Sequence, residues 1–221
     1  MNSLTRKLFL GFSLIFSLAM PGKVLWGRVP PEAVAHVTIS VYNGAGVPGG
    51  TLRQAEEEGS RVLRQAGIEV NWLNCGLPPS PEETGACQEA VFPAHLHLRI
   101  VPRSHGLKEG ALGISFLSAD GSGCQADLFY EPMERLHNSN DANLASLLGH
   151  VAAHEVGHLL LGTNSHGPAG IMQAHWVGDE IGAAKLGRLY FSGRESQKMR
   201  ETLSLRVESA RLAPHLAPPQ R

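Results

Sequence analysis

The hydrophobic and polar positions of this 221-residue chain follow two periods, and together they predict a domain of mixed strands and helices. Apolar and polar residues that alternate, with β-branched side chains among them, are typical of strands, whereas apolar residues three and four positions apart are typical of helices. The expected strands are 37–42, 68–73, 96–101, 111–117 and 126–130. The expected helices are 51–66, 141–161 and a last helical region, 179–211, broken near Ser192 and Gly193.

The order of these elements favours an α/β (α+β) domain with a twisted mixed sheet of about five strands. The first strand, helix and second strand suggest a parallel pair with a right-handed crossover. Asp141 is expected to cap the helix 141–161 with its side-chain oxygen. The segments 77–85 and 131–140 are expected to be loops that could border a cleft.

The N-terminus has the pattern of an export signal. A short basic start at 1–7 is followed by an apolar stretch at 8–20 that is short for a membrane span. We therefore expect a signal peptide at 1–27, with an uncertain cleavage site, and a secreted or periplasmic protein. A retained N-terminal anchor is the alternative. The rest predicts one domain at 28–213 and a frayed tail at 214–221.

Charge and cysteine content narrow the possible partners. The formal net charge is -1, which gives no reason to expect nucleic acid or an anionic membrane as a partner. We expect a monomer that is not stably inserted in a membrane once the signal is removed. Cys75 and Cys87 could form a disulfide in an oxidising compartment, which would leave Cys124 free; pairing of Cys124 with either of them is the other possibility.

The residues most informative about chemistry are His154, Glu155 and His158, late in the apolar helix. Residues four apart on a helix lie on one face, so His154 and His158 can bind one metal ion. Catalytic zinc uses three protein ligands and keeps a fourth position for water, from which a neighbouring carboxylate such as Glu155 can take a proton. Gly162 is expected to end the helix, and the turn after it would bring His166 back as a third ligand.

Together with Met172, these residues resemble the metzincin zinc peptidases, in which an HExxH helix ends at a glycine, a third histidine follows, and a methionine-containing turn lies beneath the metal. The spacing here, HExxHxxxGxxxH, is one residue longer on each side of the glycine than the usual form. Strict spacing would place Leu161 at the turn and Asn164 at the third ligand, so we prefer Gly162 and His166.

The resemblance implies a metzincin-like single domain with a metal-binding helix, a Met-turn and a C-terminal helix. It implies Zn²⁺ held by His154, His158 and His166, with Glu155 as the catalytic base. It also implies that the strand within 111–116 borders a cleft and pairs with extended substrate. His150 and Glu180 remain alternatives to His166 as the third ligand. Some metzincins carry a tyrosine shortly after the methionine; none occurs here, so its role is either absent or taken by His175. Trp176 is expected in the core or the cleft wall.

The leading functional prediction is a secreted zinc-dependent endopeptidase that hydrolyses peptide bonds through a zinc-bound water activated by Glu155. The alternative is a degenerate peptidase that binds zinc and peptides without cleaving them. The lengthened motif and the missing tyrosine motivate that alternative.

Overall fold

The structure, a computed structural model, describes residues 34–76, 87, 95–103, 110–140, 142–176 and 178–212. The expected signal, the C-terminal tail and the segment 77–85 lie outside these residues. The described elements are, in order, β1 (Ala35–Asn43), α1 (Gly49–Gln65), β2 (Ile68–Cys75), β3 (His95–Val101), β4 (Gly113–Phe116), β5 (Gln125–Phe129), α3 (Tyr130–Asn140), α4 (Leu144–Leu161), α5 (Gly178–Lys185) and α6 (Gly193–Leu212).

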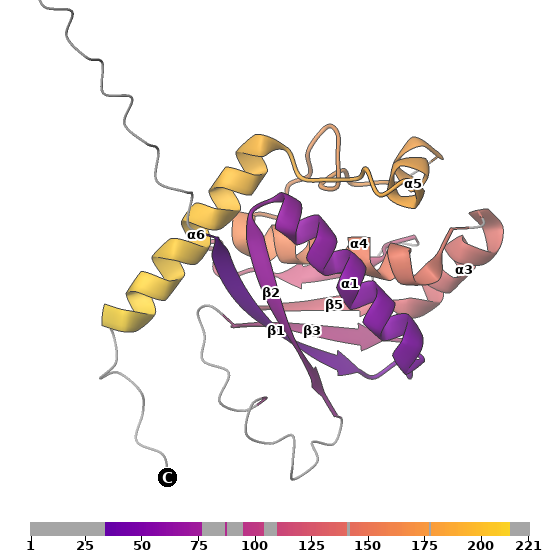
Figure 1. The fold of residues 1–221 in the computed structure, drawn as a ribbon, viewed down its shortest axis with the longest axis horizontal. Coiled ribbons are helices and arrows are strands. Elements are labelled where there is room, and N and C mark those ends of the chain that lie inside the picture. The colour runs from indigo at the N-terminus through magenta and orange to yellow at the C-terminus, as the bar shows by residue number, and fades with distance from the viewer. Residues whose placement is uncertain are drawn as a thin grey trace, which may run out of the picture. The chain divides into compact units, whose positions relative to one another are not determined.

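The five strands form one mixed sheet in the order β2-β1-β3-β5-β4 (Figure 1). β1 is parallel to both β2 and β3, and β3 is parallel to β5. β4 is antiparallel to β5 and lies at one edge of the sheet, while β2 lies at the other. The predicted parallel pair and the predicted mixed sheet are therefore confirmed, and the strand expected to bind substrate is an edge strand.

One face of the sheet is apolar because alternate residues of each strand point to the same side. Val37, Ile39 and Val41 of β1 are buried there. α1 and α4 cover this face and pack against each other (Figure 1). They approach closely at Gly149, where a Cβ atom would lie 2.5 Å from the backbone oxygen of Ala55. This packing places α4, and the motif it carries, against the sheet.

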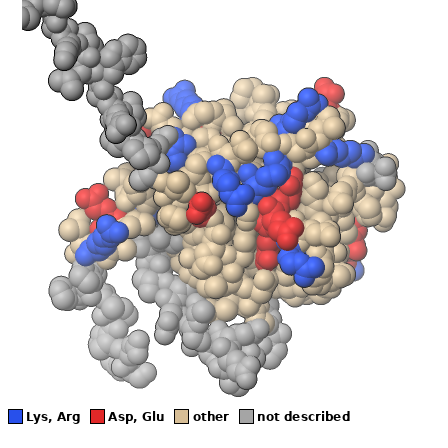
Figure 2. Space-filling model, viewed as in Figure 1, with Lys and Arg blue, Asp and Glu red and all other residues tan. Residues whose placement is uncertain are grey.

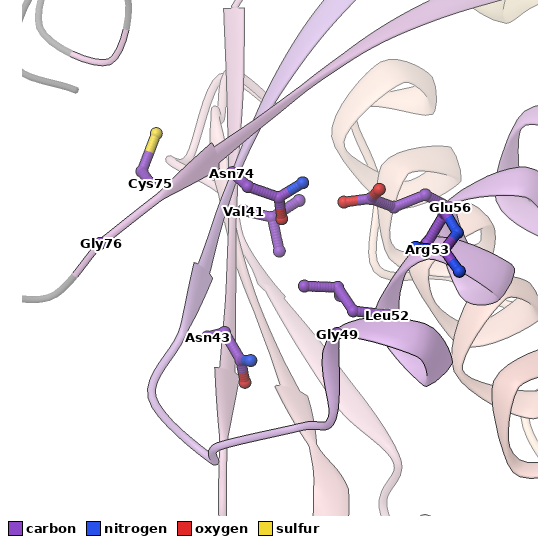
Figure 3. A pocket seen from close by; sticks show the side chains of 9 residues that line it. All are labelled: Val41, Asn43, Gly49, Leu52, Arg53, Glu56, Asn74, Cys75 and Gly76. Atoms are coloured by element: carbon purple, nitrogen blue, oxygen red, sulfur yellow. The ribbon is translucent and has the colours of Figure 1, made fainter. Parts of the chain in front are cut away.

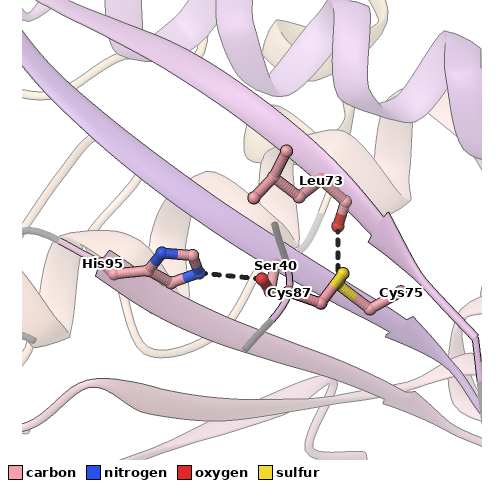
Figure 4. The surroundings of a disulfide bond; sticks show 5 residues. All are labelled: Ser40, Leu73, Cys75, Cys87 and His95. Carbon is pink, nitrogen blue, oxygen red and sulfur yellow. Dashed lines mark hydrogen bonds between the residues drawn. A yellow bond between two sulfur atoms is a disulfide. The ribbon is translucent and has the colours of Figure 1, made fainter. Parts of the chain in front are cut away.

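The opposite face of the sheet is polar. The Ser40 hydroxyl lies 2.8 Å from Nε2 of His95 in the neighbouring strand, and Arg99 of β3 donates two hydrogen bonds to Asp127 of β5. Cys75, at the end of β2, forms a disulfide with Cys87 on this side (Figure 4). The first of the two predicted pairings is thus confirmed, and Cys124 is free.

Two expectations about the helices are wrong. The metal helix begins at Leu144, and its cap is Asn143, whose side-chain oxygen accepts a hydrogen bond from the Ser146 amide, instead of Asp141. The segment 131–140, expected as a loop, belongs to helix α3. α3 buries Met133 completely against the core, and Pro132 sits in its first turn, where a missing amide hydrogen costs nothing.

The break predicted near Ser192 and Gly193 is present. α5 ends at Lys185 and α6 begins at Gly193, with residues 186–192 outside either helix. Leu189 and Phe191 in this connection are buried, so these two side chains join the core, whereas Leu186 is exposed.

Candidate metal centre

The helix that carries the motif is the central helix of the core. Nearly all of α4 is buried, from Ala145 to Leu160. By length and composition alone it could cross a membrane, but 83% of it is covered by the rest of the protein. A helix that is apolar on every side needs an apolar environment, and here the other elements of the domain supply it. The polar residues His154, Glu155 and His158 are therefore buried in a core helix and require partners there.

Gly162 ends the helix as predicted. Its φ of 70° is left-handed, a conformation that glycine adopts without a steric cost, and its amide bonds the carbonyl of His158. A Cβ atom at Gly121 would lie 2.6 Å from the Gly162 oxygen, so the turn after β4 packs directly on this helix end. The chain then turns back toward the face that bears His154 and His158.

His154 and His158 face each other. Their Nε2 atoms are 3.0 Å apart, one helical turn along α4. Each Nδ1 lies next to a backbone carbonyl, at 2.6 Å from Ile171 for His154 and 2.7 Å from Thr163 for His158. A carbonyl only accepts, so each Nδ1 carries the hydrogen and each neutral ring keeps an unprotonated Nε2 facing the other.

His166 completes a group of three. Its ring centroid lies 5.4 Å from that of His154 and 4.9 Å from that of His158. One ring nitrogen of each histidine lies within 4.8 Å of the others. His166 is exposed, whereas the other two are buried, so the group is open to solvent on the side of His166.

These three histidines fit a metal ion. Burial is the main cause that lowers the pKa of His154, to about 3, and burial also lowers the pKa of His158 and His166. Neutral imidazoles at 3.0 Å bring two lone pairs together, an arrangement that a cation between them relieves. Two nitrogens bound to one tetrahedral zinc are about 3.3 Å apart, given zinc–nitrogen bonds of roughly 2.05 Å.

The predicted methionine turn packs against α4 and contacts one of the three histidines through the Ile171 carbonyl. Met172 is buried, and a Cβ atom at Gly157 of α4 would lie 2.7 Å from its sulfur. The carbonyl of Ile171, in the same turn, accepts hydrogen bonds from His154 Nδ1 and from Trp176 Nε1. The turn therefore holds the ring of His154 in one orientation, the role that carbonyls often have behind metal-bound histidines.

Glu155 is buried beside the histidines, with 4% of its surface exposed. Burial raises its pKa to about 7, and a hydrogen bond from Ser115 opposes that shift. The Ser115 hydroxyl lies 2.7 Å from Oε2 of Glu155 and 2.9 Å from its backbone oxygen. A carboxyl group with a pKa near neutrality suits a group that both takes and gives a proton.

The alternative third ligands are not in the group. Among the residues that the structure describes, the cluster suited to a metal contains neither His150 nor Glu180. His150 is fully buried one turn earlier, with Nδ1 at 2.8 Å from the Ser146 carbonyl and 3.5 Å from Glu58. His175 is exposed and lies close enough to His166 to lower its pKa.

Trp176 is half-buried and meets the rings of both His150 and His154 edge to face. It therefore packs against these two histidines at the border of the core, and the core was one of the two places expected for it.

Ser115 and the carbonyls of Ile171 and Thr163 were not recognised from the sequence. Backbone carbonyls carry no sequence signal. Ser115 had a weak sequence signal. It lies two residues after Gly113 in the strand expected to border the cleft, and residues two apart in a strand face the same side.

A separate hollow of about 440 Å³ lies at the carboxyl ends of β1 and β2, beside the start of α1 (Figure 3). Glu56 and Asn74 face each other across it. Burial raises the pKa of Glu56, and a hydrogen bond with Asn74 opposes the shift. None of the three histidines lines this hollow, so it is distinct from the metal centre.

On the face shown in Figure 2, the acidic and basic side chains of the described residues are interspersed.

Comparison with known proteins shows similarity in structure. No protein-family model matches the sequence, and no curated protein matches it. A zinc-dependent peptidase from Methanocorpusculum labreanum matches with a TM-score of 0.51 and 18% identity, over 73% of this chain and 99% of that one. Archaemetzincin from Methanopyrus kandleri matches with a TM-score of 0.47 and 16% identity, over 80% of this chain and 99% of that one.

The first of these similarities establishes a shared fold. The mixed five-stranded sheet, the central helix with two histidines, and the turn that brings in a third all follow the arrangement expected from the sequence. This chain therefore shares the fold of the peptidase from Methanocorpusculum labreanum, with the three histidines of the predicted motif gathered at one point.

Proposed function

We propose that this protein is a zinc-dependent peptidase whose metal ligands are His154, His158 and His166 and whose catalytic base is Glu155. The observation that carries the proposal is the pair of unprotonated Nε2 atoms 3.0 Å apart, with His166 beside them. The substrate class, peptides or proteins, is supported by the position of β4: among the described residues it pairs with β5 on one side and lies at the edge of the sheet, where an extended chain can pair with it.

Zinc, when bound, polarises the scissile carbonyl and lowers the pKa of a coordinated water. The protein contributes the rest. Glu155 accepts the proton of the attacking water as the oxygen–carbon bond forms. It then donates that proton to the leaving amine nitrogen as the carbon–nitrogen bond breaks, so the carboxylate is regenerated. Ile171 and Thr163 hold the two helix histidines with their Nε2 atoms free for the metal.

The ligand set is tested by zinc content. Alanine at His154, His158 or His166 should reduce bound zinc, measured by elemental analysis after dialysis against a weak chelator. Matched controls are His150→Ala, in the same helix, and Glu180→Ala, in α5; both should keep one zinc per chain if folded by circular dichroism. Zinc lost in Glu180→Ala but retained in His166→Ala would contradict this ligand set.

The reaction is tested with a mixed peptide library and mass spectrometry. The zinc-loaded protein should produce cuts that Glu155→Gln does not, with zinc confirmed in both, because the amide keeps the shape of the side chain but accepts no proton. If neither protein cuts any peptide, the binding alternative replaces the peptidase. The cleaved sequences would also reveal the side-chain preference.

We also propose that the protein is exported. The Cys75–Cys87 disulfide supports this, since disulfides persist in oxidising compartments, and so does the signal-like segment 1–27 of the sequence. The full chain, expressed in an export-competent host, should be recovered outside the cytoplasm with a new N-terminus near residue 28. Recovery of uncleaved chain from the cytoplasm would oppose export, and uncleaved chain in the membrane would favour the anchor.

A further inference from the structure

Ser115 is the closest side-chain partner of Glu155 in the part of the chain that the structure describes. It lies in the edge strand β4, forty residues before Glu155, and only 3% of its surface is exposed. Its hydroxyl oxygen is 2.7 Å from Oε2 of Glu155 and 2.9 Å from the backbone oxygen of the same residue. The strand expected to hold substrate therefore also holds the catalytic base.

Gly113, two residues earlier on the same side of β4, makes room for the carboxyl group. A Cβ atom there would lie 2.6 Å from Oε1 of Glu155 and 2.9 Å from its Cδ and Cγ atoms. No side chain fits at that distance without displacing Glu155. Gly113 and Ser115 thus form a cradle, in which one residue leaves space for Oε1 and the other bonds Oε2.

The two acceptors around Ser115 fit both protonation states of Glu155. A hydroxyl has one hydrogen to donate and two lone pairs that accept. When Glu155 is ionised, Ser115 can donate to Oε2. When Glu155 carries the proton on Oε2, that O–H can donate to Ser115, whose own hydrogen then turns to the Glu155 backbone oxygen. Either state keeps the carboxyl group in the same place.

We propose that Ser115 is a positioning residue for the reaction, holding Glu155 in one orientation while the carboxyl group takes a proton and gives it back, with Gly113 providing the space. This proposal rests on the proposed peptidase function. It adds that the base is supported by the substrate-binding strand, so a change within β4 affects the proton-transfer step as well as peptide binding.

The test compares Ser115→Ala, Ser115→Thr and Ser40→Ala in the zinc-loaded protein. Ser40 is a matched control because it is also a fully buried strand serine with a hydrogen bond, to His95, on the opposite face of the sheet. Ser115→Ala should lower kcat by about 10- to 100-fold, the usual range for residues that support a metal site, while KM and zinc affinity change little. Ser115→Thr, which restores a hydroxyl, should recover much of the lost kcat, and Ser40→Ala should leave kcat unchanged.

A second readout is independent of activity. Thermal unfolding of the metal-free Ser115→Ala, Glu155→Ala and double variants should be non-additive, because the second substitution removes a partner already lost. Ser40→Ala combined with Glu155→Ala should be additive.

The outcomes separate the two proposals. Peptide cleavage by the unmodified protein, with kcat in Ser115→Ala no lower than in Ser40→Ala, would overturn the positioning role alone. Additive unfolding of the Ser115 and Glu155 variants would also overturn it. Absence of cleavage by the unmodified zinc-loaded protein would overturn the peptidase function, and with it the role of Ser115 in catalysis, even if the unfolding data show the contact.

Discussion

At the scale of single residues, Glu155 makes the metal-free protein sensitive to pH. Burial raises its pKa from an ordinary value of 4.5 to about 7. The native state therefore binds more protons than the unfolded state between these values, and the stability that Glu155 contributes is lost as the pH rises through this window. His154 has the opposite effect, because burial lowers its pKa from 6.5 to about 3, so its contribution is lost as the pH falls.

We therefore predict that Glu155→Gln stabilises the metal-free protein at alkaline pH. The amide is neutral at every pH, so the variant should gain in melting temperature over the wild type as the pH rises from 4.5 to 7, and keep that gain above 7. The contribution of His154 is common to both proteins and cancels. Calorimetry on chelator-treated protein measures the difference, with the exposed Glu57→Gln as control. A difference that does not vary with pH would contradict the raised pKa of Glu155.

At the scale of elements, the start of the metal helix depends on one side chain. Asn143 accepts a hydrogen bond from the Ser146 amide at 2.8 Å, which satisfies one of the unpaired amides of the first turn. Asn143→Ala should destabilise the protein by about 1 kcal/mol, measured by denaturant unfolding. Asn143→Ser, which keeps a capping oxygen, should be close to wild type. Equal losses of unfolding free energy in both variants would mean that Asn143 does not stabilise the helix through a capping hydrogen bond.

The contact between α1 and α4 is predicted to be intolerant of a single methyl group. At Gly149 a Cβ atom would lie 2.5 Å from the Ala55 carbonyl oxygen and 2.8 Å from the Cβ of Glu58. Backbone atoms of a packed helix cannot move away easily, so Gly149→Ala should cost about 1–3 kcal/mol of unfolding free energy.

Gly182→Ala is the control for that substitution. Gly182 lies in α5, and no atom of the described residues lies within 4 Å of the place that its Cβ atom would take. Alanine should therefore be neutral there or stabilise the helix by up to about 1 kcal/mol. A comparable loss at both positions would show that the loss at Gly149 does not come from the contact between the two helices.

At the scale of the whole molecule, the disulfide and the metal centre lie toward different edges of the sheet. Cys75 ends β2 at one edge, whereas β4 and Ser115 form the other. The two cysteines are 12 positions apart in the sequence, so the disulfide closes a short loop. A loop of this length restricts the unfolded chain by about 3 kcal/mol in the chain-entropy account.

We predict that stability and zinc binding respond separately to loss of this bond. Cys75→Ser with Cys87→Ser should lower the unfolding free energy by about 3 kcal/mol and leave zinc affinity, measured by chelator competition at a temperature where the protein is folded, unchanged. Cys124→Ser, which removes the free thiol, is the control for cysteine replacement. A fall in zinc affinity that accompanies the fall in stability would show that the two edges of the sheet are coupled.

The expected elements differ from the observed ones where the local pattern was weak. α3 carries Pro132 near its start and several polar residues, and only its packing against α4 shows that Met133 and Tyr130 belong to the core. Asp141 and Asn143 are both suitable caps by residue type. The position at which the first helical hydrogen bonds form decided in favour of Asn143.

Local sequence determined the parts of this protein that depend on neighbours along the chain. The four-residue spacing of His154 and His158 places both on one face of any helix, and Gly162 ends that helix because glycine tolerates a left-handed backbone. Alternation of apolar residues was enough to predict the five strands. These features follow from backbone geometry over a few residues, which a sequence specifies directly.

Only the tertiary structure decided the surroundings of the histidines and of Glu155. The Ile171 carbonyl behind His154 lies 17 residues along the chain, and the Ser115 hydroxyl lies 40 residues from Glu155. Burial, which moves the pKa of Glu155 to about 7 and that of His154 to about 3, requires the packed sheet and helices around them. Spacing in the sequence selects the residues that can bind a metal, whereas packing between distant segments sets their tautomers, their charge and the partner of the base.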